Sequence, residues 1–445
     1  MYKAYITKIE NVRKHPNADR LQLGECFGNT VCVDLSYENE QVGIYFPTDG
    51  QLSKEFAEAN NLLRIKDENG NNIGGYMDPD KRNVKAIKLR GEKSDGLFLP
   101  LTSLSSFGDI DTLKAGDAID VFNGHEICRK YIPRGKRRNL NDKTNKTRKR
   151  KVPVSPLFAE HADTEQLAYN LSVFRPGDEI EITLKIHGSS QRTAYLPVFK
   201  KYKRSIKDRL LRRDGIPVYD WGYVSGTRRT VLKNYEGGFY GSNTFREPHS
   251  KFFERKLWKG EEVFYEVCGF VNRDGVPIMP PANNKRMNDE SFLKKYGKTT
   301  TFSYGCSPVE KDGRPMSDIY VYRMTMTNED GAVVEYTPDF MRYRCAQMGV
   351  KTVPVFEKFI VPGGHPDYAT AGDYVKAIAE KYYDGPDPIG KTHVREGVVV
   401  RIVNRPKFTA FKHKNFPFKV IEGIAKETAE APDIEEAEEE NKNEQ

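Results

Sequence analysis

Hydrophobic and polar residues alternate through residues 179–190, and this pattern predicts a β-strand that ends in a tight turn. The apolar face of this strand needs a core to cover it and consists of Ile180, Ile182, Leu184 and Ile186. The opposite face carries Lys185 close to a Gly-Ser-Ser turn, where backbone N–H groups can approach an anion. A lysine in this position can act as a nucleophile if its amine is neutral. Taken alone, the pattern is more typical of a lysine on the solvent side of an edge strand.

The same alternation divides the chain into four parts. Residues 1–130 hold short alternating segments separated by turn residues, a pattern typical of a small β-barrel, with one helix expected over residues 54–63. Residues 157–425 mix strand-like and helix-like segments. A linker at 131–156 and a tail at 426–445 complete the division. The predicted fold class is therefore α+β, with an N-terminal β-barrel domain and a mixed domain of antiparallel sheets and helices.

Charge is distributed unevenly along the chain. The whole chain carries a formal charge of +8, but residues 426–445 hold nine acidic and two basic residues, so the rest carries +15. The linker is strongly basic, with ten Lys and Arg residues and one Asp in residues 134–151. Another basic run covers residues 200–213, where apolar residues at helical spacing predict a cationic helix lying over the surface. A cationic body with an acidic tail, expected to be disordered, favours a polyanionic partner, and nucleic acid is the first candidate.

The cysteines and the absence of long apolar runs indicate the compartment. The six cysteines are scattered without a C-x-x-C pair, which favours buried free thiols over disulfides or a zinc site. No signal peptide opens the chain and no apolar run is long enough to cross a bilayer, so an intracellular, cytoplasmic protein is expected. The basic linker is compatible with phosphate contacts, with a nuclear address or with a plain solvated connection.

Three further segments carry polar residues that suit a nucleotide. Arg228 and Arg229 follow a Ser-Gly-Thr turn, where a guanidinium can bind phosphate or ribose or simply belong to a surface turn. Glu266 lies in an apolar strand, where a carboxylate needs a cation, a metal or a ribose hydroxyl; a structural ion pair serves equally well. Tyr322 shares a predicted strand face with Tyr320 and can stack on a purine, although core packing is the commoner fate of such rings.

The most specific pattern lies near the C-terminal end. Glu396 and Gly397 open an apolar strand, and the next predicted strand places Lys412 and Lys414 two residues apart, hence on one face. Two lysines that point the same way repel each other unless an anion lies between them. A triphosphate is a natural anion for this position, because lysines can neutralise the oxygens that gain charge during attack on phosphorus.

The order of these segments resembles the covalent nucleotidyltransferase superfamily of polynucleotide ligases and mRNA capping enzymes. The order is Lys-x-His-Gly, a strand glutamate, an aromatic strand, Glu-Gly-Val-Val-Val and Lys-x-Lys. His187 stands where DNA ligases and capping enzymes usually have Asp, and this departure looks like certain RNA ligases. The resemblance covers nearly all of the second domain and implies an ATP-dependent RNA ligase.

The resemblance also implies a role for each motif residue. The expected catalytic residues are Lys185 as the nucleophile that accepts AMP, with Lys412, Lys414 and Glu396. The expected nucleotide-binding residues are His187, Gly188, Arg228, Glu266, Tyr322, Glu396, Lys412 and Lys414. Of these, Tyr322 is expected to stack on adenine, and Arg228 and Glu266 to hold the ribose. Glu266 and Glu396 are the expected ligands of Mg²⁺ or Mn²⁺.

The N-terminal domain has a resemblance of its own. The segments His15–Leu21 and Lys88–Pro100 look like the tRNA-binding OB domains appended to some aminoacyl-tRNA synthetases. An OB-like domain before a Lys-x-His-Gly transferase domain is similar to a family of RNA ligases, whereas DNA ligases and capping enzymes usually carry theirs after the last motif. The implied partner is RNA, as a nicked duplex with or without DNA or as broken ends, and the implied state is a monomer. NAD-dependent ligases have an extra N-terminal module that is not found here, so ATP is the expected donor.

Three alternatives remain open at this point. A DNA ligase or a capping-type nucleotidyltransferase shares the chemistry and differs only in its substrate. A non-catalytic RNA-binding protein explains the charge and the OB-like segments but leaves Lys185, Glu396 and the lysine pair unexplained. A small-molecule adenylyltransferase is the least favoured, because it has no need of such a positive charge.

Overall fold

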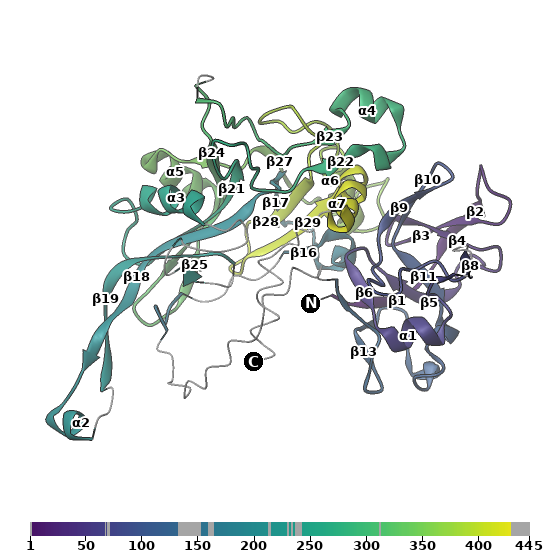
Figure 1. Ribbon diagram of the computed structural model, residues 1–445, viewed down its shortest axis with the longest axis horizontal. Coiled ribbons are helices and arrows are strands. Elements are labelled where there is room, and N and C mark those ends of the chain that lie inside the picture. The colour runs from purple at the N-terminus through teal and green to yellow at the C-terminus, as the bar shows by residue number, and fades with distance from the viewer. Residues whose placement is uncertain are drawn as a thin grey trace. The chain divides into compact units, whose positions relative to one another are not determined.

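The protein is described by a computed structural model over residues 2–66, 68, 72–131, 153–158, 164–211, 215–228, 231–232, 235, 243–310 and 313–428 (Figure 1). These residues form antiparallel sheets with few helices, so the predicted α+β class is confirmed. Most of the predicted basic linker and acidic tail lies outside the described residues. Within them, no helix combines the length and the apolar character that a membrane span requires.

The chain divides into two compact units. Unit one is assembled from Met1–Lys136, Ala282–Thr300 and Phe416–Glu440, and unit two contains the remaining residues. Two short segments from the second half of the chain thus join the N-terminal region. The domain boundaries expected from the sequence stay a prediction, because local alternation carries no information on such long-range assembly.

Unit one consists of short strands in several small sheets. Its strands are β1 (Ala4–Lys8), β2 (Glu10–Lys14), β3 (Gln22–Cys26), β4 (Asn29–Val33), β5 (Val42–Phe46), β6 (Gly50–Leu52), β7 (Ile65–Lys66), β8 (Asn72–Gly74), β9 (Ala86–Leu89), β10 (Glu92–Asp95), β11 (Leu97–Pro100), β12 (Ala118–Ile119), β13 (Val121–Phe122), β14 (His125–Glu126), β15 (Cys128–Lys130), β22 (Ala282–Asn283) and β23 (Thr299–Thr300). The largest sheet has four antiparallel strands in the order β11-β5-β1-β12. No closed barrel is found among the described residues of this unit, so the predicted β-barrel is not confirmed.

The described residues of unit one include three α-helices: α1 (Lys54–Ala59), α4 (Glu290–Tyr296) and α7 (Phe416–Thr428). α1 begins where the sequence predicts it, because the Ser53 hydroxyl caps it by accepting a hydrogen bond from the Phe56 N–H at 3.0 Å. It ends at Ala59, four residues before the predicted end at 63. The Phe56 side chain is fully buried in the core of this unit.

Unit two is built on two larger sheets. Its strands are β16 (Glu165–Gln166), β17 (Glu179–Lys185), β18 (Ser189–Lys203), β19 (Ile216–Gly226), β20 (Val231–Leu232), β21 (Glu261–Gly269), β24 (Ser317–Thr327), β25 (Val333–Glu335), β26 (Lys351–Thr352), β27 (Val355–Ile360), β28 (Gly397–Ile402) and β29 (Thr409–Lys414). Its helices are α2 (Ile206–Leu210), α3 (Glu247–Phe252), α5 (Pro338–Met348) and α6 (Ala371–Glu380). The five-stranded sheet has the order β16-β29-β28-β17-β27, and the seven-stranded sheet has the order β20-β19-β18-β21-β24-β25 with β26 beside β24.

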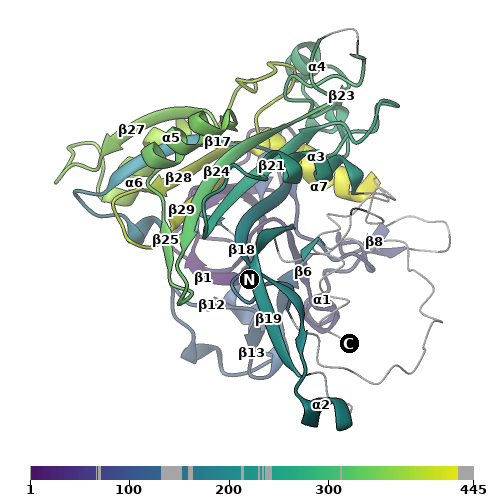
Figure 2. The same ribbon diagram turned by 90° about the vertical axis from the view of Figure 1, so that its left-hand side faces the viewer.

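Helices cover one face of each sheet of unit two (Figure 2). On the five-stranded sheet, Val375 and Ile378 of α6 pack with Ile180 and Val398 in a fully buried cluster. On the seven-stranded sheet, the cluster is completed by α5, whose buried side chains include Met341. The alternation of apolar residues in β17 predicted its buried face correctly. The six cysteines are free, and five of them are buried, as predicted.

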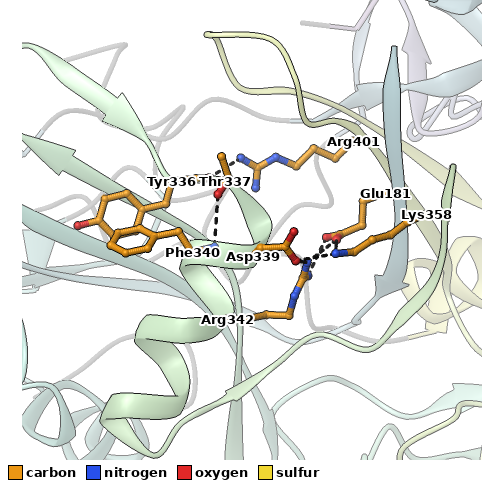
Figure 3. Close-up of polar contacts among 8 residues, drawn as sticks. All are labelled: Glu181, Tyr336, Thr337, Asp339, Phe340, Arg342, Lys358 and Arg401. Atoms are coloured by element: carbon orange, nitrogen blue, oxygen red, sulfur yellow. Dashed lines mark hydrogen bonds and ion pairs between the residues drawn. The ribbon is translucent and has the colours of Figure 1, made fainter. Parts of the chain in front are cut away.

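A polar network attaches α5 to the other face of the five-stranded sheet (Figure 3). Glu181 of β17 is 3% exposed and accepts two hydrogen bonds from Arg342 of α5, at 3.0 and 2.7 Å. It also faces Lys358 of β27 at 3.4 Å, and Arg401 of β28 lies directly opposite it in the sheet. The same helix therefore packs its apolar side on one sheet and its charged side on the other. In this way α5 fixes the two sheets of unit two to each other.

Asp339 completes this network at its solvent edge. Its carboxylate accepts hydrogen bonds from Lys358 and Arg342, both at 2.6 Å, and these lower the pKa of Asp339 to about 2. Its side chain is 79% exposed, so water screens these interactions and they contribute little to stability. Glu181 and Asp339 thus contact the same two cations from a buried and an exposed position.

We predict that Glu181→Gln lowers the free energy of unfolding by about 3 kcal/mol, because it removes the buried carboxylate that Arg342 and the buried Arg401 face. Asp339→Asn is the matched control and should cost less than about 1 kcal/mol. Both tryptophans, Trp221 and Trp258, lie in unit two, so urea unfolding followed by tryptophan fluorescence reports on this unit. Equal shifts of the urea midpoint in the two variants would contradict the assignment.

Candidate active site

Lys185, Gly397 and Lys414 form a row across three neighbouring strands. Lys185 is paired with Gly397 between β17 and β28, and Gly397 is paired with Lys414 between β28 and β29. Residues in one cross-strand row point to the same side of a sheet. The middle residue has no side chain, so it places nothing between the two lysines. Register alone therefore brings together two lysines that are far apart in the sequence.

Glu396 supplies the counter-charge for both lysines. Its Oε1 lies 2.8 Å from Lys185 Nζ and 3.3 Å from Lys414 Nζ. The Glu396 side chain is 2% exposed, Lys414 is 11% exposed and Lys185 is 21% exposed. A buried carboxylate that contacts two ammonium groups leaves a net positive charge in a poorly hydrated place. Such a place favours a further anion beside the lysines.

Gly397 is required at the start of β28. Its φ is +146°, and a Cβ built on it would lie 2.1 Å from the His413 carbonyl oxygen. Any other residue would both clash and be strained at this φ. The unusual backbone at Gly397 directs the preceding residue, Glu396, toward the lysines.

His187 lies two residues after Lys185 and is fixed by contacts with three other residues. Its backbone N–H donates to the hydroxyl of Tyr304 at 2.7 Å, and its ring meets Phe302 edge to face at 4.6 Å. Its Nδ1 lies 3.8 Å from Glu396 Oε2. Burial raises the pKa of Tyr304 well above its ordinary value, so its phenol stays protonated. Tyr304 and Phe302 were missed in the sequence because they lie in an irregular segment with no periodicity to mark them.

The turn after His187 packs tightly against the second sheet. A Cβ on Gly188 would lie 2.8 Å from the Val267 carbonyl oxygen and 3.2 Å from the Glu266 Cβ. Arg246 lies buried behind the turn, where it donates to the Ser190 carbonyl at 3.0 Å and to the Ser189 hydroxyl. Arg246 is another residue that the sequence did not reveal, since it precedes a short helix with no motif around it.

Tyr322 lies at an irregularity of β24. Opposite β21, Val321 pairs with Tyr265 and Arg323 pairs with Phe264, so Tyr322 is the extra residue of a β-bulge. Tyr320 pairs with Glu266 across the sheet, and Glu266 pairs in turn with Ser190 of β18. The Tyr322 hydroxyl lies 3.4 Å from the Ser190 hydroxyl.

Glu266 and Arg228 act on Tyr322 electrostatically. Burial first, and then the charge of Glu266, raise the pKa of Tyr322, while the positive charge of Arg228 opposes this rise. Arg228 follows Thr227, whose carbonyl accepts a hydrogen bond from the buried Arg192 at 3.0 Å. Arg229 lies outside the described residues. These residues form the part of the candidate site that the seven-stranded sheet contributes.

The structure thus groups the predicted site residues in two sets. Lys185, His187, Glu396 and Lys414 are joined by contacts of 3.8 Å or less. Gly188, Glu266, Tyr322 and Arg228 belong to the adjoining turn and the second sheet. Lys412 lies opposite Val399, two rows away from Lys414 on the same strand. Gly188 links the two sets because it follows His187 and packs on Glu266.

The predicted metal ligands are separated between these sets. Glu396 already contacts two lysines, and Glu266 lies on the other sheet. Among the described residues there is no group of three or more His, Cys, Asp or Glu side chains that suits a metal ion. The residues therefore fit a Mg²⁺ or Mn²⁺ ion only as partial ligands, the usual situation where substrate phosphates complete the coordination.

In unit one, the two OB-like segments lie against each other. His15 is 1% exposed, and its Nε2 lies 3.1 Å from the Leu89 carbonyl oxygen. The Asn17 amide donates to the Arg90 carbonyl at 3.0 Å. Lys419 of α7 contacts Asp95 at 2.5 Å, so the C-terminal helix joins the same region. Sequence reasoning found both segments but not the helix that packs on them.

Comparisons with known proteins give the fold of the chain. No family model matches it, and no curated protein matches it in sequence. Solved structures of the RNA ligase of Naegleria gruberi do match it. A mutant with ATP and Mn aligns with a TM-score of 0.54 at 17% identity, over 94% of this chain and 98% of that chain. A mutant with AMP and Mn gives 0.53 at 17% identity over 94% and 97%, and the enzyme with PPi gives 0.53 at 16% identity over 93% and 96%.

The chain shares the fold of these RNA ligases. The fold expected from the motif order is therefore confirmed. At this level of identity the likeness is one of fold alone.

We predict that Tyr304→Phe weakens the support of His187, because its backbone N–H loses a buried acceptor. The loss should be about 1 to 2 kcal/mol, so the His187 amide should exchange with solvent about tenfold faster. Hydrogen exchange measured by NMR or mass spectrometry tests this. The control is Tyr343→Phe, which removes a hydroxyl on an exposed side chain that accepts a hydrogen bond from Gln347. Unchanged exchange at His187 in Tyr304→Phe would show that the hydroxyl does not hold this segment.

Proposed function

We propose that this chain is an ATP-dependent RNA ligase. It joins a 3′-hydroxyl RNA end to a 5′-phosphate RNA end through a lysyl-AMP and an adenylylated RNA. The observation that carries this proposal is the pair of lysines, Lys185 and Lys414, on one oxygen of the buried Glu396. The fold neighbours support it, since the Naegleria gruberi RNA ligase structures contain ATP and Mn, AMP and Mn, or PPi.

The charge of the site suits the reaction proposed for it. The two positive charges of Lys185 and Lys414 exceed the single negative charge of Glu396. Lys412 adds a further cation on the same strand face. In a nucleotidyl transfer, negative charge increases on the oxygens of the α-phosphate and on the departing pyrophosphate. Fixed ammonium groups in a poorly hydrated site stabilise such charge more strongly than water does.

In the first step Lys185 becomes adenylylated. Its Nζ attacks the α-phosphorus of ATP, an N–P bond forms, and the bond to the β-phosphate oxygen breaks with release of pyrophosphate. The amine must lose protons, and Glu396 Oε1 lies 2.8 Å away, within reach of one of them. Lys414 and Lys412 neutralise the phosphate oxygens.

In the later steps AMP is transferred from Lys185 to the 5′-phosphate of the RNA and is then released. A 5′-phosphate oxygen attacks the phosphorus of lysyl-AMP, the N–P bond breaks, and Lys185 takes up a proton. The 3′-hydroxyl oxygen of the other end then attacks the activated 5′-phosphate, and AMP leaves with the pair of electrons of the broken bond. Tyr322 stacks on the adenine, and Arg228 and Glu266 hold the ribose in this proposal.

A divalent ion supplies positive charge next to the phosphates when it is bound. Glu396 and Glu266 are the residues that would hold it, together with phosphate oxygens. Gly188 keeps the turn close to Glu266, and Arg246 fixes the turn through the Ser190 carbonyl and the Ser189 hydroxyl. These residues orient the nucleotide whether or not the ion is present.

Unit one is proposed to bind the RNA. Its paired segments around His15 and Leu89 are similar to tRNA-binding OB domains, and its sheets are made of the short strands that such domains contain. An OB-like module binds polynucleotides on a strand face without strong sequence preference. This role accounts for a strand-rich unit in a chain that also has the transferase fold.

We predict that the protein retains label from α-³²P-ATP in the presence of Mg²⁺ or Mn²⁺ and that Lys185→Ala retains none. Lys414→Ala should lower the rate of labelling about a hundredfold, because a fixed cation is lost from the developing charge. The exposed Lys381 is the matched control, and Lys381→Ala should label as the unmodified protein does. Label on Lys185→Ala would remove Lys185 as the nucleophile and with it the proposed reaction.

We also predict that the enzyme seals a nick whose 3′-hydroxyl strand is RNA faster than the same nick with DNA in that strand. The 2′-hydroxyl is the group by which a protein distinguishes the two polymers. Gel analysis of nicks that differ only in this strand measures the preference. A preference for DNA would point to a DNA ligase. Transfer of label from α-³²P-GTP to the 5′ end of an RNA would point to a capping enzyme.

A further inference from the structure

β18 and β19 form a hairpin that projects from unit two. Figures 1 and 2 both show the two strands leaving the other strands of the unit together and ending at α2. β18 pairs with β21 only from Ser189 to Ala194, but it pairs with β19 as far as Lys203. We call the described residues 195–211 and 215–223 the arm. The cationic helix that the sequence predicted here is present as α2, but it does not lie over the surface, because its Ile206 and Leu210 are 77% and 78% exposed.

Aromatic rings stiffen the arm. Tyr195 and Tyr223 face each other across the strands and stack at 4.6 Å, and Phe199 meets Tyr219 at 6.1 Å. Trp221 lies between these pairs, opposite Pro197. Cross-strand aromatic pairs stabilise a two-stranded ribbon that would otherwise be marginal in water. The outer part of the arm is therefore held in a defined direction.

The outer part of the arm is strongly basic. Its exposed cations include Lys200, Lys201, Lys203 and Lys207, none of which has a carboxylate partner among the described residues. The main cations in the body of unit two differ, since Arg192, Arg342 and Arg344 each bind a glutamate. Unpaired lysines on a projecting ribbon are typical of contacts with phosphates.

The arm is connected directly to the candidate active site. β18 begins four residues after Lys185, at Ser189, and continues without a break to Lys203. At about 3.3 Å per residue, this strand spans up to about 45 Å. Each nucleotide of one strand adds about 3.4 Å along the axis of a duplex, so this length corresponds to more than ten nucleotides.

We propose that the arm binds the backbone of the substrate RNA about ten or more nucleotides away from the ends being joined. This proposal rests on the proposed ligase function and adds a subsite to it. The lysines bind phosphates, and the aromatic pairs keep them at a fixed distance from Lys185. The enzyme thereby favours ends that belong to long RNA segments.

The test compares long and short substrates with the variant Lys201→Gln/Lys203→Gln/Lys207→Gln. The substrates carry about 20 or about 6 nucleotides on each side of the nick, lengths that reach or fall short of the arm. For the long substrate, KM should rise about tenfold, and the slope of log affinity against log salt should fall by about two. For the short substrate, KM should stay within about twofold, and self-adenylylation should be unchanged.

Two control variants test whether the effect depends on the charge and the position of the arm lysines. Lys251→Gln/Lys381→Gln/Lys391→Gln removes the same charge from scattered exposed positions and should leave KM for the long substrate within about twofold. Ile206→Ser/Leu210→Ser removes apolar surface at the tip without changing charge and should also leave KM unchanged. The proposal would be overturned if the arm lysine variant raised KM equally for the long and the short substrate. It would also be overturned if either control variant raised KM for the long substrate as much as the arm lysine variant does. A change of oligomeric state in the Ile206→Ser/Leu210→Ser variant that accompanies weaker binding would overturn it too, because the tip would then dock a second copy.

Failure of the ligase function can be distinguished from failure of this proposal. Fluorescence anisotropy with labelled long RNA measures binding without catalysis. Suppose that the unmodified protein takes no label from ATP and that the lysine variant binds RNA more weakly than the unmodified protein. The arm then binds RNA, and the proposed ligase function is wrong. If labelling is normal and the lysine variant binds long RNA as the unmodified protein does, the arm has no such role.

Discussion

The candidate site depends on one buried carboxylate that is shared by two ammonium groups. Glu396 is almost completely buried, and its Oε1 contacts both Lys185 and Lys414. A carboxylate in this environment would be costly without cations, and two lysines side by side would repel each other without it. The burial of each of these three charged side chains therefore depends on the presence of the opposite charge beside it. The strand register provides the arrangement, because Lys185, Gly397 and Lys414 occupy one row, and the positive φ of Gly397 turns Glu396 toward that row.

Each of the two sheets of unit two contributes different residues to this site. The five-stranded sheet carries the charged row, and the seven-stranded sheet carries Glu266 and Tyr322. The relative position of the two sheets is fixed by α5, which buries Met341 on one sheet and binds Glu181 of the other through Arg342. Glu181 lies on the same strand and the same face as Lys185, so the network that fixes α5 also fixes the strand that bears the proposed nucleophile.

The arm and unit one both suit a polymer substrate. β18 continues from the turn beside Lys185 into a stiff basic ribbon, so one strand connects the proposed chemistry with the proposed recognition of distant phosphates. Unit one, built from three segments of the chain, offers a strand-rich surface of the kind that binds polynucleotides. A small-molecule transferase has no use for either feature, which is why RNA is favoured as the partner.

The sequence by itself determined the strands and the order of the motifs. The alternation in β17, the glycine before the valines of β28 and the paired lysines of β29 are local properties, and period-two patterns report them reliably. Tertiary structure decided which side chains meet. Only long-range pairing shows that Lys414 reaches Glu396, that Tyr304 supports His187, that Arg246 holds the Ser189 turn and that Tyr322 lies in a bulge. It also decided that the basic run ends a projecting hairpin, because exposure depends on what packs against a segment and not on its own composition.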